Sequence, residues 1–503
     1  LIDSWWHAYN NHRPPVNMPY SHYFEDVPEQ VGEIFPHTLR KLHDSTGFLF
    51  GAHWSSSFSP DSPYRSIGAW ECGNNTEGAE VQCIPVANVL GESTTAFDYI
   101  FKSDLRWGMK VLKMDHVLNI ILGDKAASKT CGHKTDQPCR HGERNASIAP
   151  GSLFQMLTTT DVSDRYFDGL GVSAEKHGID IMLCMSFPNV LMHSVNLVAV
   201  THGRGSTDSH PRHNAHGFPY DNWKGFGGES TFLWSLGLWP FKDTFYSNSS
   251  SRVRNKFAED YGGTETMPFT QALVSALGGG GFAPGGPVGD ADVALLMMSC
   301  DKSGTLLKPS TPAMYIDRVW SGDERVGETS VAITSIGLYM WRYTSIINNT
   351  EFLLYPRDVG IVATDAVEYV AYFWCSSRPL GKSCESKLLP FDSETPVMVP
   401  SSNWTEPNGA EAQYVLITPR LSGKWVLMGE FDKFVPVSKM RVESFSAKPS
   451  AVTLNLIVRS VGEVLHFRFG TPRLDIVHAR CVVRSRGRLQ MTVYLDHRVE
   501  CSQ

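Results

Sequence analysis

The stretch MKVLKMD at residues 109–115 places Lys113 and Asp115 at the end of a largely apolar run. A short apolar run of this kind is typical of a strand that is buried on both faces of a parallel sheet. Alternate residues of a strand share a face, so Lys113 and Asp115 are expected to point to the same side. A structural ion pair is one interpretation. Burying such a pair gains little stability, however, and charges at the carboxyl end of a parallel strand are typical of an active site.

The first 300 residues contain four more apolar stretches with polar or aromatic ends. These predicted strands are FLFGAHW (48–54), IDIMLCMS (179–186), NLVAVTHG (196–203) and FLWSLGLW (232–239). Amphipathic patterns at 27–47 and 163–178 predict helices between them. Apolar strands separated by helices predict a parallel sheet covered by helices, either an α/β barrel or a doubly wound sheet.

The pattern changes after about residue 330. Segments such as SVAITSIGLYMW, VEYVAYFW, KWVLMGEF, AVTLNLIV and MTVYL alternate with turn residues, which predicts an antiparallel β domain. We therefore predict two domains, a (β/α)8 TIM barrel over residues 1–328 and a C-terminal antiparallel β-sandwich over 329–503. Residues 122–160 are polar and are expected to form a loop inserted after the 109–115 strand.

The composition excludes several classes of protein. The 503 residues carry a net charge of −7 and no run of lysine or arginine, which argues against a nucleic-acid partner. No apolar run is long enough to span a bilayer. The histidines of HPRHNAH (210–216) have no carboxylate that completes a metal site, and Gly278–Gly281 precede no GK[ST] phosphate-binding motif. We therefore expect neither a metal nor an organic cofactor.

Cysteines and glycosylation motifs indicate the secretory pathway. Eight of the ten cysteines are near neighbours in polar or terminal segments, and we predict the disulfides Cys72–Cys83, Cys131–Cys139, Cys375–Cys384 and Cys481–Cys501. Asn-x-Ser/Thr motifs occur at Asn74, Asn145, Asn248, Asn348 and Asn403. Together these features predict a secreted, lysosomal or vacuolar glycoprotein.

A second carboxylate follows another predicted strand, in VTHGRGSTDSHP at 200–211. Asp208 lies four residues after Arg204 on a loop rich in glycine and serine. An exposed turn is the simpler interpretation of this segment taken alone. Two carboxylates from two barrel strands, however, are the minimum equipment for cleaving a glycosidic bond, one as nucleophile and the other as proton donor.

These segments, taken in order, resemble glycoside hydrolase family 36, the α-galactosidases and raffinose synthases. VLKMD is similar to the family's Lys-x-Asp strand, IMLCMS to the strand that follows, and RGSTDSHP to its Arg-x-Ser-Asp-Asp segment. WPFKDTFYS (239–247) is similar to a Trp-Asp-Met-Phe segment, and ALGGGGFAPGGP (276–287) to the Gly-Gly strand that closes the barrel. MGEFDKFVPVSKMRVESF (428–445), in the predicted β domain, also resembles the family.

The resemblance implies roles for individual residues. Asp115 corresponds to the nucleophile and Asp208 to the acid/base, while Lys113 corresponds to a lysine that contacts sugar hydroxyls. An ammonium close to a carboxylate lowers the pKa of the carboxyl group, so Lys113 is expected to keep Asp115 ionised. Asp243 is placed near the sugar, and we assign Arg204 to sugar hydroxyls or to the loop backbone.

The opening segment IDSWW resembles the family's Ile-Asp-Asp-Gly-Trp first strand, with Ser4 in place of the second Asp. The resemblance implies that Asp3 is a sugar-binding carboxylate, whereas the change at Ser4 weakens the case for galactose. Trp6 and Trp54 lie near predicted strand ends and are candidate sugar-stacking residues, with core packing as the competing interpretation. Thr207 replaces the other Asp of the acid/base segment.

The sequence thus predicts a retaining glycoside hydrolase that acts on α-linked sugars, most simply α-galactosides in an oligosaccharide or glycoconjugate. Two alternatives stay open, a transglycosidase of the raffinose-synthase type and a non-catalytic carbohydrate-binding or structural glycoprotein. Family 36 enzymes usually carry an N-terminal β-sandwich before the barrel. The resemblance therefore implies that this domain is missing, cleaved off or present as another chain, and in the last case that chain is a partner.

Overall fold

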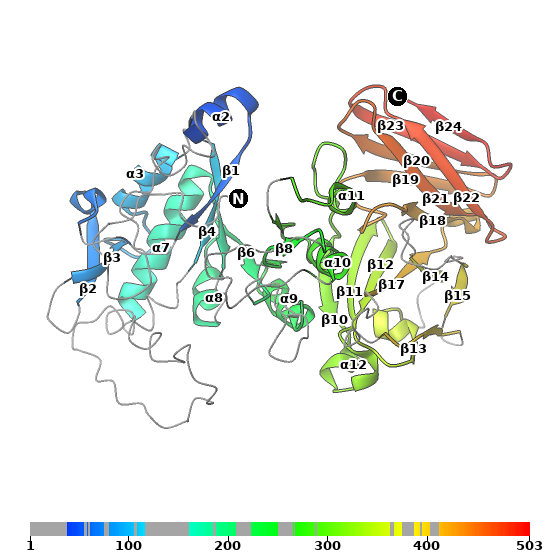
Figure 1. Cartoon of the computed structure of the whole chain (residues 1–503), viewed down its shortest axis with the longest axis horizontal. Coiled ribbons are helices and arrows are strands. Elements are labelled where there is room, and N and C mark those ends of the chain that lie inside the picture. Colours follow the sequence, from blue (N-terminus) through cyan, green and yellow to red (C-terminus); the bar gives the residue numbers. More distant parts are fainter. Residues whose placement is uncertain are drawn as a thin grey trace. The chain divides into compact units, whose positions relative to one another are not determined.

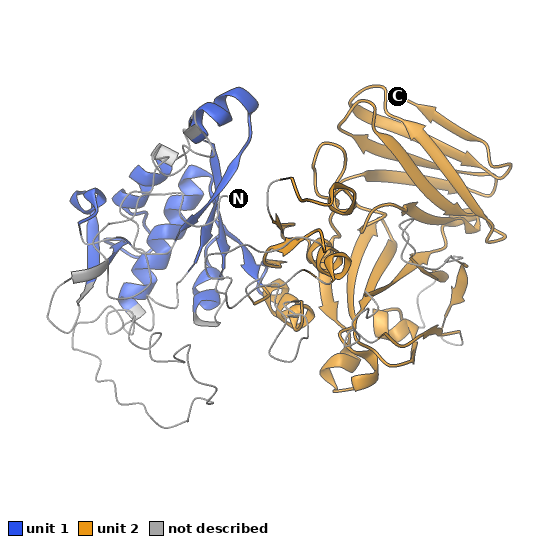
Figure 2. Ribbon diagram, in the orientation of Figure 1, with its two compact units in different colours: residues 1–204, 236–238 blue, residues 205–235, 239–503 orange. Residues whose placement is uncertain are grey.

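The computed structural model describes residues 38–54, 58, 61–74, 80–104, 108–115, 160–184, 188–207, 223–249, 265, 267–286, 289–362, 367–374, 387–392, 395–402 and 412–503. The chain forms two compact units, residues 1–204 with 236–238 and residues 205–235 with 239–503 (Figure 2). The first division along the chain thus follows residue 204. The domain boundary expected at residue 328 stays a prediction.

Unit 1 is built on parallel strands in the order β1-β4-β5-β6 (Figure 1). Their bounds are β1 Phe50–Trp54, β4 Met109–Met114, β5 Asp180–Leu183 and β6 Val200–Arg204. An antiparallel hairpin, β2 (Ala69–Asn74) and β3 (Glu80–Val86), carries the disulfide between Cys72 and Cys83. The helices of this unit are α2 Thr38–Thr46, α3 Thr95–Asp104, α7 Thr160–His177 and α8 Pro188–Ser194.

One face of the parallel strands is apolar and contacts a helix. Its side chains are fully or almost fully buried: Ala52, Trp54, Leu112, Met114, Ile181 and Leu183. Trp54 packs edge-to-face on Phe97 of α3, and Phe97 in turn contacts Tyr166 of α7. Burial of this face is the main stabilising term of the sheet, since apolar area removed from water contributes about 25 cal/mol per Å².

Unit 2 contains a six-stranded antiparallel sheet in the order β10-β11-β12-β17-β14-β15. These strands are β10 Thr311–Tyr315, β11 Ser330–Ile336, β12 Tyr339–Ile346, β14 Tyr369–Phe373, β15 Leu389–Phe391 and β17 Gln413–Pro419. Tyr414 and Leu416 of β17 belong to one hydrophobic cluster, whereas Val415 and Ile417 belong to another. Strand alternation therefore buries both faces of this sheet.

The remaining strands of unit 2 form smaller sheets. They are a β18-β21-β22 sheet (Val426–Glu430, Val464–Gly470, Ile476–Val482), a β19-β20-β23-β24 sheet (Val442–Lys448, Ala451–Val458, Gly487–Tyr494, Val499–Ser502), the pair β13 (Phe352–Leu354) and β16 (Val397–Val399), and the pair β8 (Phe245–Tyr246) and β9 (Pro284–Gly285). Strand β7 (Trp239–Phe241) and helices α9 (Phe226–Ser235), α10 (Pro268–Gly278), α11 (Val293–Leu296) and α12 (Asp317–Trp320) complete the unit. A disulfide between Cys481 of β22 and Cys501 of β24 joins two of the sheets.

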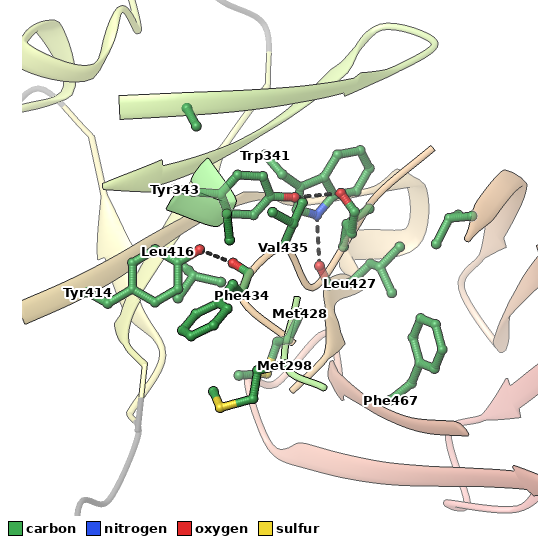
Figure 3. Close-up of a cluster of buried hydrophobic side chains, with 14 of the residues drawn as sticks. Met298, Trp341, Tyr343, Tyr414, Leu416, Leu427, Met428, Phe434, Val435 and Phe467 are labelled. Atoms are coloured by element: carbon green, nitrogen blue, oxygen red, sulfur yellow. Dashed lines mark hydrogen bonds between the residues drawn. The ribbon is translucent and has the colours of Figure 1, made fainter. Parts of the chain in front are cut away.

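Buried aromatic side chains with polar ends hold the larger core together (Figure 3). Trp341 Nε1 donates a hydrogen bond to the Leu427 carbonyl at 2.8 Å, and the Tyr343 hydroxyl donates to the Val437 carbonyl at 2.6 Å. The Tyr414 hydroxyl donates to the carbonyl of Phe434. Burial raises the pKa of both tyrosines, so their hydroxyls stay protonated and donate. The core therefore buries large rings without leaving these polar atoms unsatisfied.

The fold confirms part of the prediction from sequence. Four of the five predicted parallel strands are present, and the C-terminal part is rich in antiparallel strands. The prediction for residues 232–239 was wrong, because Phe226–Ser235 is helix α9 and a strand begins only at Trp239. Within the part of the chain that the structure describes, the parallel strands form an open row. The closed barrel and the sandwich arrangement therefore stay predictions.

Unit 2 also contains a buried cluster of ion pairs centred on Arg441. The Arg441 side chain is fully buried and lies between Glu430, with Nε to Oε2 at 3.0 Å, and Glu463, with Nη2 to Oε1 at 2.5 Å. Its Nη1 also donates to the Ile457 carbonyl at 3.0 Å. Arg441 thus links the end of β18 to the end of β20 and the turn before β21.

Replacing Arg441 by alanine is expected to destabilise unit 2 by about 3–5 kcal/mol, because two buried carboxylates lose their counter-charge. The measurement is urea unfolding followed by tryptophan fluorescence, since Trp341 and Trp425 are buried in this unit. Arg488→Ala is the matched control, because Arg488 pairs with Glu443 at the surface. Equal losses of stability in both variants would contradict a structural role for the buried pair.

Candidate functional site

Polar side chains gather on the face of the unit 1 sheet that is opposite the buried apolar residues. His53 of β1 and Lys113 of β4 are register partners, so their side chains lie on the same face. Asp115 follows two residues after Lys113 and continues that face. Trp54 pairs with Met114, which places both on the opposite, apolar face. The sheet therefore separates a polar, charge-bearing face from an apolar one.

His53 and Asp115 make the central contact of this face. His53 Nε2 lies 3.1 Å from Asp115 Oδ2. An ionised carboxylate only accepts hydrogen bonds, so Nε2 carries the proton and donates it. The Asp115 backbone N–H donates to the Trp54 carbonyl at 2.8 Å, which fixes the start of the segment after β4. Both the backbone and the side chain of Asp115 are thus held by β1.

Burial distinguishes the three charged or titratable groups. His53 and Lys113 are 2% and 4% exposed, whereas the Asp115 side chain keeps 14% of its surface exposed. The carboxylate is therefore the member of the group that solvent reaches most easily. A nucleophile needs such access, and the groups that orient it do not.

The polar face extends over the neighbouring strands. Met182 of β5 pairs with Lys113, and His202 of β6 pairs with Met182, so both lie on the face of His53. Arg204, the last residue of β6, lies two positions after His202 and is on the same face by alternation. The Thr201 hydroxyl is 2.7 Å from His202 Nδ1. Reasoning from sequence missed His53 and His202. His202 lies two residues before Arg204, whereas only the register of β1 on β4 places His53 beside Lys113.

Trp54 does not lie with the candidate site. Its ring packs against Phe58 at 5.5 Å and Phe97 at 5.4 Å between ring centroids, and it is 1% exposed. This placement on the apolar face favours core packing over sugar stacking. The position of Trp54 at a strand end was compatible with sugar stacking or with core packing. The alternation of side chains along β1 distinguishes the two roles.

Unit 2 holds Asp243 in a separate polar group. The Asp243 backbone N–H donates to Ser206 Oγ at 2.9 Å, and Lys242 Nζ donates to the Asp243 carbonyl at 3.1 Å. Lys242 is fully buried, and its ammonium lies 5.6 Å from the centre of the Phe245 ring. Burial lowers the pKa of Lys242 to about 8, although the charges of Glu265 and Asp243 act in the opposite direction.

The glycine run packs closely, as predicted, but not as a strand. Residues 268–278 form α10, and Gly279 ends this helix in the left-handed conformation with φ 72°. A Cβ on Gly280 would lie 2.4 Å from the Pro240 carbonyl oxygen, and the Gly280 N–H donates to that oxygen at 3.2 Å. Glycine is required here because the helix end meets the backbone of β7.

Several predicted residues lie outside the residues that the structure describes. These are Asp3, Trp6, Asp208, Asn145, Asn403 and the cysteines of the pairs Cys131–Cys139 and Cys375–Cys384. Among the glycosylation candidates, Asn348 is exposed and Asn248 Nδ2 donates to Asp290 at 3.1 Å, while Asn74 ends β2. The disulfides Cys72–Cys83 and Cys481–Cys501 are present.

No group of three or more histidine, cysteine, aspartate or glutamate side chains in the described part of the chain could hold a metal ion. No helix there is long and apolar enough to cross a membrane.

Comparison with known proteins gave only distant structural likeness. No family model and no curated protein matches the chain. A candidate α-galactosidase/melibiase from Bacteroides fragilis is 11% identical, with a TM-score of 0.42, over 82% of this chain and 70% of that one. Isomaltulose synthases from Protaminobacter rubrum and Klebsiella sp. LX3 are 9% and 10% identical, each with a TM-score of 0.34, over 82% of this chain and 91% of theirs. At TM-scores below 0.5 this likeness carries no inference about fold or activity.

The buried Lys242 has a consequence for stability as a function of pH. The folded pKa of about 8 is below the usual 10.5, so the unfolded chain binds the proton more tightly between these values. The contribution of Lys242 to the free energy of unfolding is therefore lowest below pH 8 and rises towards pH 10.5. Lys242→Met should raise stability at neutral pH by up to roughly 3 kcal/mol, and this gain should shrink as the pH rises.

The measurement is the difference in melting temperature between Lys242→Met and wild type from neutral to alkaline pH. Lys439→Met, which changes an exposed lysine, should show no such trend. A gain from Lys242→Met that does not depend on pH would contradict a depressed pKa in the folded protein.

Proposed function

We propose that the chain is a retaining glycoside hydrolase for α-linked sugars, with α-galactosides as the first substrate class to test. The observation that carries the proposal is the Asp115 carboxylate, which follows a buried parallel strand, accepts a hydrogen bond from His53 and shares a face with Lys113. The Lys-x-Asp spacing is also the feature in which the sequence resembles family 36. Location in the secretory pathway is part of the proposal and is supported by two disulfides in the structure.

The proposed reaction has two displacement steps. Asp115 attacks the anomeric carbon and forms a glycosyl ester, while Asp208 gives its proton to the departing glycosidic oxygen. Asp208 then removes a proton from water, which attacks the anomeric carbon and releases Asp115. Retaining chemistry requires the two carboxyl groups to lie about 5–5.5 Å apart in the working enzyme. An acceptor sugar in place of water would give a transglycosidase with the same residues.

His53 and Lys113 have distinct roles in this mechanism. His53 orients Asp115, since its Nε2 proton is donated to the Oδ2 carboxylate oxygen. Lys113 supplies a cation on the same face and a donor for sugar hydroxyls. Arg204 and Asp243 are proposed sugar contacts, as the sequence resemblance implies.

Asp115→Asn is expected to lower release of nitrophenol from a nitrophenyl α-galactoside by roughly 10³-fold or more, because the amide cannot form the ester. In Asp115→Gly, added azide should restore turnover and give the β-galactosyl azide, since azide attacks from the face that the carboxylate vacates. Asp180→Asn, at the exposed start of β5, is the matched control and should keep wild-type activity.

Wild-type turnover that survives Asp115→Asn would exclude Asp115 as nucleophile. If folded wild-type protein acts on no α-galactoside, galactose is excluded, and a panel of other nitrophenyl α-glycosides then decides between another sugar and a non-catalytic role.

His53 gives a separate test of how Asp115 is positioned. His53→Ala should lower kcat/KM by roughly 10–100-fold, which corresponds to one hydrogen bond to a charged group. In His53→Gln the amide N–H can donate to Asp115, so a large part of this loss should be recovered, mainly in kcat. Equal activity in the two variants would contradict the positioning role, and circular dichroism checks that both are folded.

A further inference from the structure

Strand alternation gives β21 and β22 one apolar and one basic face. Leu465 and Phe467 of β21 are buried in the unit 2 core, whereas His466 and Arg468 lie on the other face. In β22, Ala479 is buried and the side chains on either side of it are exposed. Those exposed side chains are His478 and Arg480.

The register brings basic side chains together on the outer face. Arg468 is the cross-strand partner of His478, and His466 is the partner of Arg480. Directly opposite side chains in an antiparallel pair have Cβ atoms about 4.5–5.5 Å apart, so each arginine lies beside a histidine. We call this set of four residues the β21–β22 basic face.

Phe431 anchors the β21–β22 basic face. The Arg468 guanidinium lies 4.0 Å from the centre of the Phe431 ring, and the His466 and His478 rings lie 6.1 and 6.0 Å from it. Burial lowers the pKa of Arg468, and burial together with the charge of Arg468 lowers the pKa of His478. The arrangement thus holds a partly desolvated cation in a fixed position.

Several arginines of unit 2 pair with carboxylates, in contrast to Arg468 and Arg480. Arg498 pairs with Glu500 at 2.5 Å, Arg420 with Glu368 at 3.2 Å and Arg459 with Asp301 at 3.1 Å. Among the residues that the structure describes, no carboxylate lies within ion-pair distance of Arg468 or Arg480, and the buried Arg468 Nε has no hydrogen-bond partner. Four basic side chains are therefore grouped without a counter-charge from that part of the chain.

We propose that the β21–β22 basic face binds a tetrahedral oxyanion, the sulfate or phosphate ester of a sugar. A tetrahedral oxyanion offers several acceptor oxygens to guanidinium and imidazole donors at once, and charge-assisted hydrogen bonds of this type are the stronger ones. Its charge also offsets the positive charge of Arg468 and Arg480. The site is distinct from Asp115 and does not depend on the proposed hydrolase activity.

The test is isothermal titration calorimetry of the full chain with glucose 6-phosphate and glucose 6-sulfate at low salt, with glucose as the neutral control. At least one ester should bind with a Kd below about 1 mM, and glucose should not bind at this site. Binding of both esters assigns the site to the oxyanion in general, and binding of one identifies its source. If neither ester binds more tightly than glucose, the proposal is wrong.

Variants locate the site. Arg468→Gln with Arg480→Gln should weaken ester binding at least roughly tenfold. Arg473→Gln with Arg486→Gln makes the same change in net charge at exposed positions outside the β21–β22 basic face and should leave binding unchanged. His478→Gln with Arg480→Gln alters only exposed side chains, so it gives the same answer if loss of Arg468 impairs folding. Equal weakening in the Arg473/Arg486 control would overturn the assignment to this face.

Discussion

The alternation of side chains along a β-strand is the constraint on which both units depend. In unit 1 it assigns Trp54, Leu112 and Met114 to the apolar face and His53, Lys113 and Asp115 to the polar one. In unit 2 it divides β17 between two hydrophobic clusters and gives β21 an apolar and a basic face. A shift of one residue in the register of β1 on β4 would exchange the two faces, removing Asp115 from His53 and exposing the apolar side chains.

The sequence correctly predicted those elements whose local residue pattern distinguishes a strand from a helix. MKVLKMD is short, with apolar residues before a charged end, and it forms β4 as expected. FLWSLGLW is equally apolar, yet its first half is the end of α9 and only its last residue lies in a strand. A continuous apolar run is compatible with a buried helix as well as a buried strand, so periodicity does not decide between them. Closure of a barrel is a long-range property that no local pattern encodes.

The candidate site was predicted in part for the same reason. Lys113 and Asp115 are two residues apart in one strand, so their common face follows from the sequence alone. His53 is 62 positions before Asp115, and only the register of β1 on β4 brings the two together. Trp54 shows the reverse case, since its position near a strand end suggested a sugar contact. Its pairing with Met114 places it instead in the apolar core.

The charged groups around Arg441 and around Asp115 differ in how fully they are enclosed. Around Arg441, the Glu430 and Glu463 side chains are 2% and 7% exposed, and guanidinium nitrogens contact both carboxylates. Asp115 instead keeps 14% of its side chain exposed beside a histidine and a lysine that are almost fully buried. A completely buried charge is typical of a structural role, because its hydrogen bonds are then all made by the protein and none by water. Asp115, by contrast, stays accessible to solvent while its neighbours are buried, which gains less stability. This difference in exposure is why we propose a chemical role for Asp115 and a structural one for Arg441.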